Sequence, residues 1–309
     1  EGAISTMIAA DPVAIPVLNR FHGVFVQDST TIVLPDVLEE IWQGCGGSGP
    51  VSAVKAQVRV DLTSGRLEGP CLSHGREADV RSVLSGGDLP AGSLRIFDLG
   101  YWDLDRLAQI ELAQAYWLSR LKLSTAIFDE DGNACDLLAL VLEDGRDQID
   151  RPILLGAKHR LGCRLLAVRV PPQVAEQRRR RLNQEARKKG QTVSARRRAL
   201  ADWTILVTNA PADRLTVKEA LVLMRARWQV ELLFKLWKTH GQVDKSRSHK
   251  PWRVLCEVYA KLIALVIQHW VMITGCWRSA DRSLVKALHT VRKHALHLAA
   301  VFHSLSRLC

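Results

Sequence analysis

An unbroken alternation of apolar and polar residues runs from Val54 to Leu62. Apolar side chains take every second position and charged or amide side chains take the others, which is the period of a half-buried β-strand. A Thr-Ser-Gly turn follows at residues 63–65, and the chain from Leu67 onward is predicted to be the hairpin partner. The chain must therefore build a sheet.

Two further extended segments carry an acidic residue. Val24–Leu34 is rich in Val, Thr and Ile and is closed by Pro35, and Leu94–Phe97 is a short apolar run that stops at Asp98. We expect Asp28 and Asp98 to lie at the ends of strands. Carboxylates at strand ends are candidate metal ligands.

The charge of the chain is strongly positive. Lys and Arg number 43 against 32 Asp and Glu in 309 residues, which gives a net charge of +11 and favours a polyanionic partner such as nucleic acid. Because 47% of the residues are hydrophobic, the chain is expected to fold around a sizeable core. Residues 176–198 hold ten cationic and two acidic residues, and this run is predicted to be a solvated helix or loop.

Residues 110–212 form a predicted β-rich segment. Its short apolar runs are separated by Asp-Gly and Pro-Pro pairs. Trp117 and Trp203 are predicted to be buried, not to stack on a nucleic-acid base. The runs predicted to be extended are Ser124–Phe128, Leu137–Leu142, Arg164–Val170 and Trp203–Val207.

The chain after Pro211 has helical periodicity. Thr216 and Glu219 form a capping box that opens a helix reaching about Lys238. Trp252–Trp277 and Asp281–Leu308 are predicted to form a helical tail. The apolar stretch within the first of these is interrupted by Gln and His and falls short of a membrane span, so we expect a buried helix.

One face of the 216–238 helix gathers charge. Arg227, Glu231 and Lys238 lie within about 40° of one another at 100° per residue, and Lys235 borders this face. On an arbitrary helix such a set is an ordinary surface salt-bridge ladder. The upstream carboxylates of Asp28 and Asp98 favour a metal-binding catalytic site instead. Three residues are predicted to pack inward from the other faces, namely Trp228, Leu232 and Leu236.

These residues resemble the DDE transposases of bacterial insertion sequences, specifically insertion-sequence family four. The hallmark of that family is Tyr, two residues, Arg, three residues, Glu, six residues, Lys, and Arg227, Glu231 and Lys238 match it while Met224 takes the Tyr position. The sequence around each acidic site is also similar to the family. The matching phrases are Asp28-Ser29-Thr30-Thr31, Asp98-Leu99-Gly100-Tyr101, Tyr116-Trp117-Leu118-Ser119-Arg120-Leu121-Lys122 and the Arg-Trp-Gln-Val-Glu-Leu-Leu-Phe-Lys run at 227–235.

The resemblance implies an α/β fold with an RNase H-like mixed-sheet core. Asp28 would lie on the first strand, Asp98 after the fourth, and Glu231 on a later helix. The 133 residues between Asp98 and Glu231 exceed what one strand and helix need, so a β-rich insertion is expected there. The predicted division is core at 1–109, insertion at 110–212, core helix at 213–250 and helical C-terminal region at 251–309.

The resemblance also implies which residues would bind metal and which would bind DNA. Asp28, Asp98 and Glu231 would be catalytic and would hold two Mg²⁺ ions, with Mn²⁺ as a substitute. The expected partners are the inverted-repeat ends, target DNA and a second copy in a synaptic homodimer. The cations predicted to contact DNA phosphates are Arg227, Lys235, Lys238, Arg178, Arg179, Arg180, Arg181, Lys188 and Lys189.

Two rival functions stay open at this stage. One is an RNase H-like nuclease without strand transfer. The other is a decayed relative that binds DNA without cutting it, which Met224 favours because it cannot donate the hydrogen bond of the family Tyr. Only 27 residues precede Asp28, so the chain is expected to be a fragment without the N-terminal DNA-binding domain usual in the family.

The cysteines indicate the compartment. Seven are scattered along the chain without any Cys-x-x-Cys pair, which suggests neither a zinc site nor a disulfide framework. No signal peptide is visible. We therefore expect a bacterial cytoplasmic protein, bound to the nucleoid when on DNA and not to a membrane.

Overall fold

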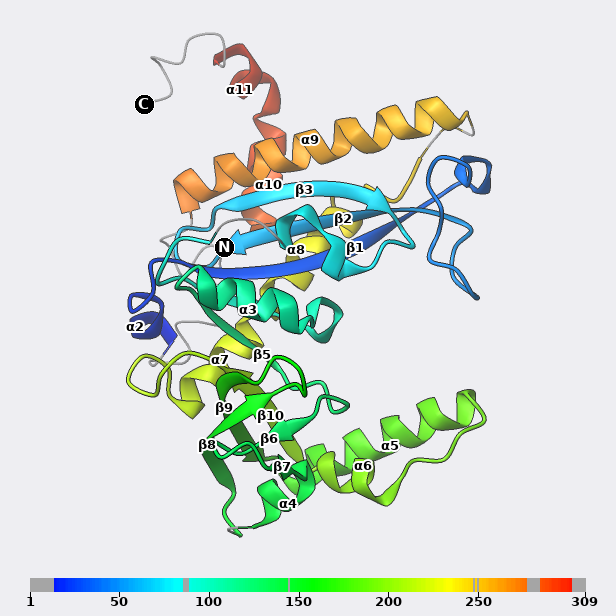
Figure 1. The fold of residues 1–309 in the computed structure, drawn as a ribbon. Helices are drawn as coiled ribbons and strands as arrows, with labels where there is room; N and C mark the ends of the chain where they lie inside the picture. The colour runs from blue at the N-terminus through cyan, green and yellow to red at the C-terminus, as the bar shows by residue number, and fades with distance from the viewer. Residues whose placement is uncertain are drawn as a thin grey trace. The chain divides into compact units, whose positions relative to one another are not determined.

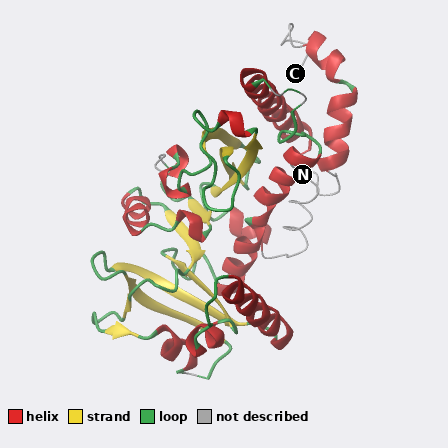
Figure 2. Ribbon diagram, turned by 90° about the vertical axis from the view of Figure 1, so that its right-hand side faces the viewer, coloured by secondary structure: helices red, strands yellow, loops and turns green. Residues whose placement is uncertain are grey.

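The computed structural model describes residues 14–85, 89–143, 145–246, 248, 250–276 and 284–301. The chain divides into two compact units, the first formed by residues 1–87 with 222–309 and the second by residues 88–221. Both contain strands and helices (Figures 1 and 2), so the fold is mixed α/β and consistent with an RNase H-like domain. The predicted boundaries of core and insertion stay predictions.

The first unit contains an antiparallel sheet of β1 (Val24–Leu34), β2 (Ser52–Asp61) and β3 (Leu67–His74). The predicted hairpin of β2 and β3 and the predicted extent of β1 are confirmed. Asp28 is on the first strand as expected, but it does not end that strand. It pairs with Val58 in mid-strand, because the β-favouring Ser-Thr-Thr-Ile-Val sequence after it continues the ladder to Leu34.

The polar face of β2 is covered, which corrects the prediction of a half-buried strand. Gln57 and Arg59 are 1% and 6% exposed. Arg59 Nε donates to Glu68 at 2.8 Å, and Lys55 Nζ donates to Asp79 at 3.0 Å. Partners on β3 and on the segment after it therefore satisfy the polar side chains, so that both faces of β2 are buried.

Helices complete the first unit after residue 227. They are α8 (Trp228–Thr239), α9 (Pro251–Cys276), α10 (Leu284–Lys293) and α11 (Ala295–Val301), with α2 (Ala14–Leu18) near the start of the chain. α8 packs against β1. The predicted helical tail is confirmed for these residues, while Trp277, Asp281 and residues 302–309 lie outside the described part of the chain.

The second unit begins with a parallel pair. β4 (Leu94–Phe97) and β5 (Tyr116–Arg120) are joined by α3 (Leu104–Leu112), which starts at the cap residue Asp103. Antiparallel strands continue from β5 in the order β10, β9, β8, β6, β7. Their bounds are β6 Ile127–Phe128, β7 Ala134–Cys135, β8 Gln148–Leu155, β9 Leu161–Arg169 and β10 Trp203–Thr208.

Several predicted strands of this unit are confirmed, and one is wrong. Leu137–Leu142 is the helix α4, because Asp136 caps it by accepting from the Ala139 amide at 2.9 Å. The Arg-rich run is helical, forming α5 (Pro172–Lys188) and α6 (Ala195–Leu200). Trp117 and Trp203 are buried as predicted, at 0% and 4% exposure.

α9 is long and apolar. Among the described residues it alone has the length and composition of a membrane-crossing helix, with a mean hydropathy of 1.5 over Pro251–Met272. One such helix is weak evidence for a membrane, because core helices of soluble proteins share this composition. The prediction of a buried helix is correct for one side only, since Ile263 and Trp270 on the other side are 60% and 62% exposed.

Candidate active site

The helical segment that carries Glu231 starts with the predicted capping box. Thr216 Oγ1 accepts from the Glu219 amide at 3.3 Å, and a Glu219 carboxylate oxygen accepts from the Thr216 amide at 3.0 Å. Two amides at the helix start are thereby satisfied. The capping box is confirmed.

The single helix predicted from Thr216 to Lys238 is instead two. α7 (Val217–Ala226) ends one residue before Arg227, and α8 starts one residue after it. Arg227 keeps helical dihedrals, but its carbonyl accepts from the Val230 amide at 3.1 Å, three residues on instead of four. The helical path continues with a local tightening at Arg227.

Arg227 joins two of the predicted catalytic carboxylates. Its Nη1 lies 2.7 Å from Asp28 Oδ2, and its Nη2 lies 2.9 Å from Glu231 Oε1. The guanidinium presents its two terminal nitrogens to residues 199 and 4 positions away, so one side chain bridges β1 and α8. We call Asp28, Arg227 and Glu231 the ion triad.

The ion triad is only partly open to solvent. The side chains of Arg227, Asp28 and Glu231 are 10%, 17% and 42% exposed. The other oxygen of Asp28, Oδ1, accepts from the Ser29 amide at 2.8 Å, which fixes this carboxylate against its own strand. The carboxylates of Asp28 and Glu231 therefore face the Arg227 guanidinium, and solvent reaches this group of residues mainly at Glu231.

Asp98 belongs to the second unit. It directly follows β4, the fourth strand of the chain, as predicted. Its Oδ1 accepts from the Leu99 amide at 2.6 Å and caps the short turn of 3-10 helix at Leu99–Tyr101. The backbone thus orients this carboxylate locally.

The donor set suits a hard cation. Asp28 and Glu231 contribute carboxylate oxygens, the ligands that Mg²⁺ prefers. The Arg227 guanidinium lies between them and forms an ion pair with each. Arg227 brings Asp28 and Glu231 together within the first unit. Among the residues that the structure describes, no group of three His, Cys, Asp or Glu side chains is placed to hold a metal ion.

The other predicted residues of α8 differ in their exposure to solvent. Lys235 is exposed and Lys238 is half-buried. Trp228 was predicted to pack inward, and that prediction is wrong, since this first residue of α8 is 55% exposed. Leu236 is buried as predicted, and Leu232 is half-buried.

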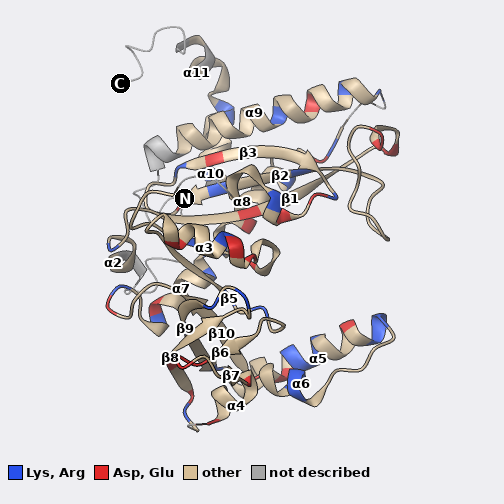
Figure 3. Ribbon diagram, viewed as in Figure 1, with Lys and Arg blue, Asp and Glu red and all other residues tan. Residues whose placement is uncertain are grey.

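Lys and Arg recur along α5 and α6 (Figure 3), and their contacts divide them into two groups. Arg178 donates to the Trp203 carbonyl at 2.8 Å and to Thr204 Oγ1 at 2.9 Å. Arg179 pairs with Asp202 at 2.6 Å, and Arg180 pairs with Glu176 one turn away. The cations exposed to solvent are Arg180, Arg181, Arg187, Lys188, Lys189, Arg196, Arg197 and Arg198, of which Arg180 pairs with Glu176 and Arg196 with Asp136.

The family is decided by a model of the transposase DDE domain, which matches residues 19–267. The chain belongs to the transposase DDE domain family. This DDE domain is 28% identical over 270 residues to the transposase for insertion sequence element IS231F of Bacillus thuringiensis subsp. israelensis, covering 81% of the chain and 56% of that relative. It is 24% identical over 276 residues to the transposase for IS1151 of Clostridium perfringens, covering 82% and 58%.

The chain thus spans little more than half the length of these relatives. The family agrees with the insertion-sequence resemblance of the sequence, and the DDE domain implies in general a dependence on divalent metal. The link from Arg227 to Asp28 was not foreseen. The i, i+4 spacing signals the pairing of Arg227 with Glu231, but no local pattern encodes a contact with a strand 199 residues away.

Proposed function

We propose that this DDE domain is the catalytic region of an insertion-sequence transposase, which cuts DNA at transposon ends and joins the freed 3′-hydroxyl to target DNA. The observation that carries the proposal is the ion triad, in which the signature Arg227 and Glu231 meet the upstream Asp28. A surface salt-bridge ladder would not reach a carboxylate on another element. The membership of the family supports the same reaction class.

The proposed metal ligands are Asp28, Asp98 and Glu231, holding two Mg²⁺ ions that Mn²⁺ can replace. Bound metal supplies activation of the attacking oxygen and stabilisation of the leaving oxygen in phosphoryl transfer. The contribution of the protein itself is to orient the three carboxylates. Arg227 holds Asp28 and Glu231 toward a common point, and the Ser29 and Leu99 amides fix the carboxylates of Asp28 and Asp98.

Lys235, Lys238 and Arg227 are the proposed phosphate contacts beside the cut strand end. Lys235 is exposed and Lys238 half-buried on the helix that carries Glu231, so both can reach a backbone phosphate while Glu231 faces the reacting group. Met224 is buried at 9% exposure on α7, so we do not assign it the phosphate contact that the family Tyr makes. This places the phosphate-binding role on cations.

The exposed cations of α5 and α6 are the proposed second contact with DNA. Of the residues predicted from the sequence, we keep Arg180, Arg181, Lys188 and Lys189 as phosphate contacts, because their side chains are exposed. Arg178 and Arg179 are engaged within the second unit, and we assign them to its stability. Affinity through such contacts falls steeply with salt, by about 0.9 in log–log slope per phosphate.

The proposed partners are the inverted-repeat ends of the element, target DNA and a second copy in the synaptic complex. The place of action is the bacterial cytoplasm, on the nucleoid. The inverted-repeat sequence is read from the DNA on either side of the gene.

A strand-transfer assay tests the function. Duplexes ending in the inverted repeat, already cut to expose the 3′-hydroxyl, are mixed with supercoiled target DNA, protein and Mg²⁺. We expect covalent joining that chelation of the metal abolishes. If uncut ends are cleaved but precut ends never join, the protein is a nuclease, and if DNA is bound without either reaction in Mg²⁺ or Mn²⁺, it is a non-catalytic relative.

A further inference from the structure

The outer face of α9 is apolar although it is exposed. Nine residues of α9 with described side chains are exposed, and Arg253 alone among them is charged. Surface helices of soluble proteins normally turn a polar face to water. Contiguous exposed apolar surface on a soluble protein marks an interaction site.

The large side chains of this face form a narrow stripe. At 100° per residue they fall within about 80° of arc, and they lie opposite the buried side of α9. We call them the α9 stripe: Trp252 (69% exposed), Tyr259 (42%), Ile263 (60%), Ile267 (43%) and Trp270 (62%), together with the exposed Cys256.

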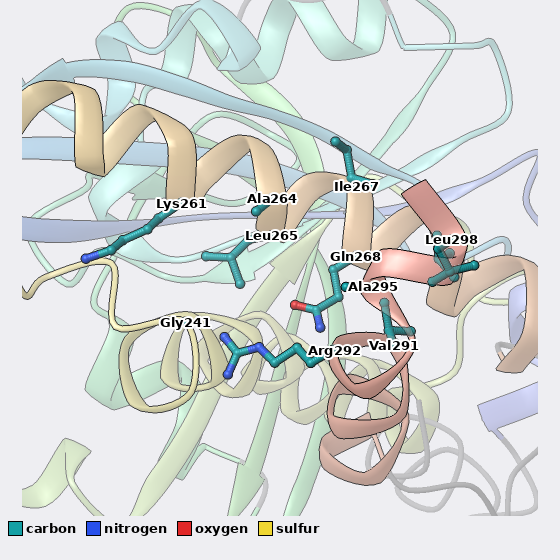
Figure 4. Close-up of a pocket in the computed structure, with 11 residues that line it drawn as sticks. Gly241, Lys261, Ala264, Leu265, Ile267, Gln268, Val291, Arg292, Ala295 and Leu298 are labelled. Carbon is teal, nitrogen blue, oxygen red and sulfur yellow. The ribbon is translucent and has the colours of Figure 1, made fainter. Parts of the chain in front are cut away.

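Grooves flank the α9 stripe on both sides. One has a volume of about 360 Å³ and is lined by Pro70 and Leu72 of β3 and by Tyr259, Ile263 and Ile267 of the stripe. The other, of about 410 Å³, lies between α9 and the helices α10 and α11, where Lys261, Gln268 and Arg292 line it (Figure 4). The stripe is therefore a ridge between two grooves, a shape that receives another ridge.

Hydrogen bonds hold α9 to the rest of the first unit, and they argue against its insertion into a lipid bilayer. Lys261 Nζ donates to the Gln242 carbonyl at 3.0 Å, Gln268 donates to the Leu288 carbonyl at 3.1 Å, and His269 contacts the Gly65 carbonyl at 2.9 Å. A helix that crossed a membrane would lose all three. An interfacial helix would carry several Lys or Arg residues along its exposed side, where α9 has Arg253 only.

Four of the six members of the α9 stripe lie symmetrically about position 261. Trp252 and Trp270 lie nine residues to either side of it, and Tyr259 and Ile263 lie two residues to either side. Lys261 itself points away from the stripe, because its ammonium group binds carbonyls on the inner side. Ile267 and Cys256 have no counterpart in the stripe, because their mirror positions hold the buried Leu255 and the half-buried Val266. The other four residues can meet across two antiparallel copies, which is the arrangement of a two-fold dimer.

We propose that the α9 stripe is a homodimer interface in which two copies of the chain pair α9 antiparallel across a two-fold axis near Lys261. Trp252 of each copy packs against Trp270 of the other, and Tyr259 packs against Ile263, with the side chains of one ridge entering a groove of its partner. The interface involves neither metal nor DNA. It forms whether or not the proposed transposition chemistry is correct.

The first test is the mass of the DNA-free protein by sedimentation equilibrium. We expect a dimer for the wild-type chain and a monomer for Ile263→Lys, because two lysines would be buried at the centre of the interface. Leu112→Lys is the matched control, since Leu112 is 81% exposed on α3 and should leave the dimer intact. Circular dichroism confirms that the variants are folded. A monomeric wild type or a dimeric Ile263→Lys variant would overturn the proposal.

The second test measures the relative orientation of the two α9 helices in the dimer. In the antiparallel pair the two copies of Cys256 lie about 15 Å apart along the axis at 1.5 Å per residue, too far for a disulfide, whereas Cys256 lies opposite position 266. Val266→Cys should therefore form an intermolecular disulfide under mild oxidation, and Val266→Cys with Cys256→Ser should not. Wild-type cross-linking through Cys256 would indicate a parallel pair. A monomer that sediments with phosphatidylcholine vesicles would assign the stripe to a membrane instead.

Discussion

At the scale of single residues, the site depends on one guanidinium. Arg227 is largely buried and faces two carboxylates from different elements, so its charge offsets a repulsion that would otherwise push Asp28 and Glu231 apart. The same three residues were singled out from the sequence by their types and spacing. Their mutual contact was not, because it depends on how β1 packs against α8.

Replacing Arg227 should destabilise the fold. Arg227→Met leaves two carboxylates facing each other at a partly buried site, and we expect a loss of about 2–3 kcal/mol in the free energy of unfolding, discounted for the exposure of Glu231. Part of that loss should return when Mg²⁺ is added. Urea unfolding measures both effects. Lys235→Met on the exposed side of α8 is the control, and an equal loss in that variant would contradict a specific role for Arg227.

His269 should make the stability of the first unit depend on pH. Burial lowers the pKa of His269 below its ordinary value of 6.5, an effect that the bond with the Gly65 carbonyl offsets only in part. Because that carbonyl accepts from Nε2, Nδ1 carries no proton in the neutral ring, and it is buried with no hydrogen-bond partner among the residues that the structure describes. The unfolded chain therefore takes up a proton that the folded chain resists, and stability falls as the pH drops below 6.5.

The measurement is urea unfolding between about pH 7.5 and 5. Wild type should lose more stability across this range than His269→Gln, which retains a donor for the Gly65 carbonyl. His22→Gln removes an exposed histidine and should behave as wild type. Equal slopes for wild type and His269→Gln would show that His269 does not titrate in the unfolding equilibrium.

At the scale of elements, strands with a clear pattern were predictable and helix surfaces were not. Val24–Leu34 and the hairpin at residues 54–74 match the structure because alternation and turn residues specify them locally. The apolar run at 137–142 has no alternation, so its cap Asp136 was the one signal that it is a helix. The exposure of Trp228 and of the α9 stripe depends on neighbouring elements, which periodicity alone does not identify.

The arginines of α5 should differ in whether they stabilise the fold or bind DNA. Arg178→Met removes donors to the Trp203 carbonyl and Thr204, and should cost about 1–2 kcal/mol of stability with little change in the salt dependence of DNA binding. Arg181→Met should leave stability within about 0.5 kcal/mol and lower the log–log salt slope by about 0.9. Thermal unfolding and fluorescence anisotropy at several salt concentrations measure the two effects. The assignment fails if the two variants behave alike.

At the scale of the whole molecule, the positive net charge and the family membership both support DNA as the partner. The excess of cations lies largely on α5 and α6 of the second unit, and the ion triad lies in the first unit, within a DDE domain that matches residues 19–267. A positive surface accounts for binding to any DNA, but it does not account for chemistry. The central claim is therefore that Asp28, Asp98 and Glu231 act together as metal ligands in cutting DNA.

The most direct measurement is Mg²⁺-dependent cleavage of DNA carrying the inverted-repeat ends, compared among wild type, Asp28→Asn, Asp98→Asn and Glu231→Gln. Each amide keeps the size of the side chain and removes the charge that holds the metal. Asp36→Asn, at an exposed carboxylate outside the proposed site, is the control. We predict that all three variants lose cleavage and bind DNA within a few-fold of wild type, while the control cleaves normally. Cleavage at the wild-type rate by any one of the three would contradict the proposed site.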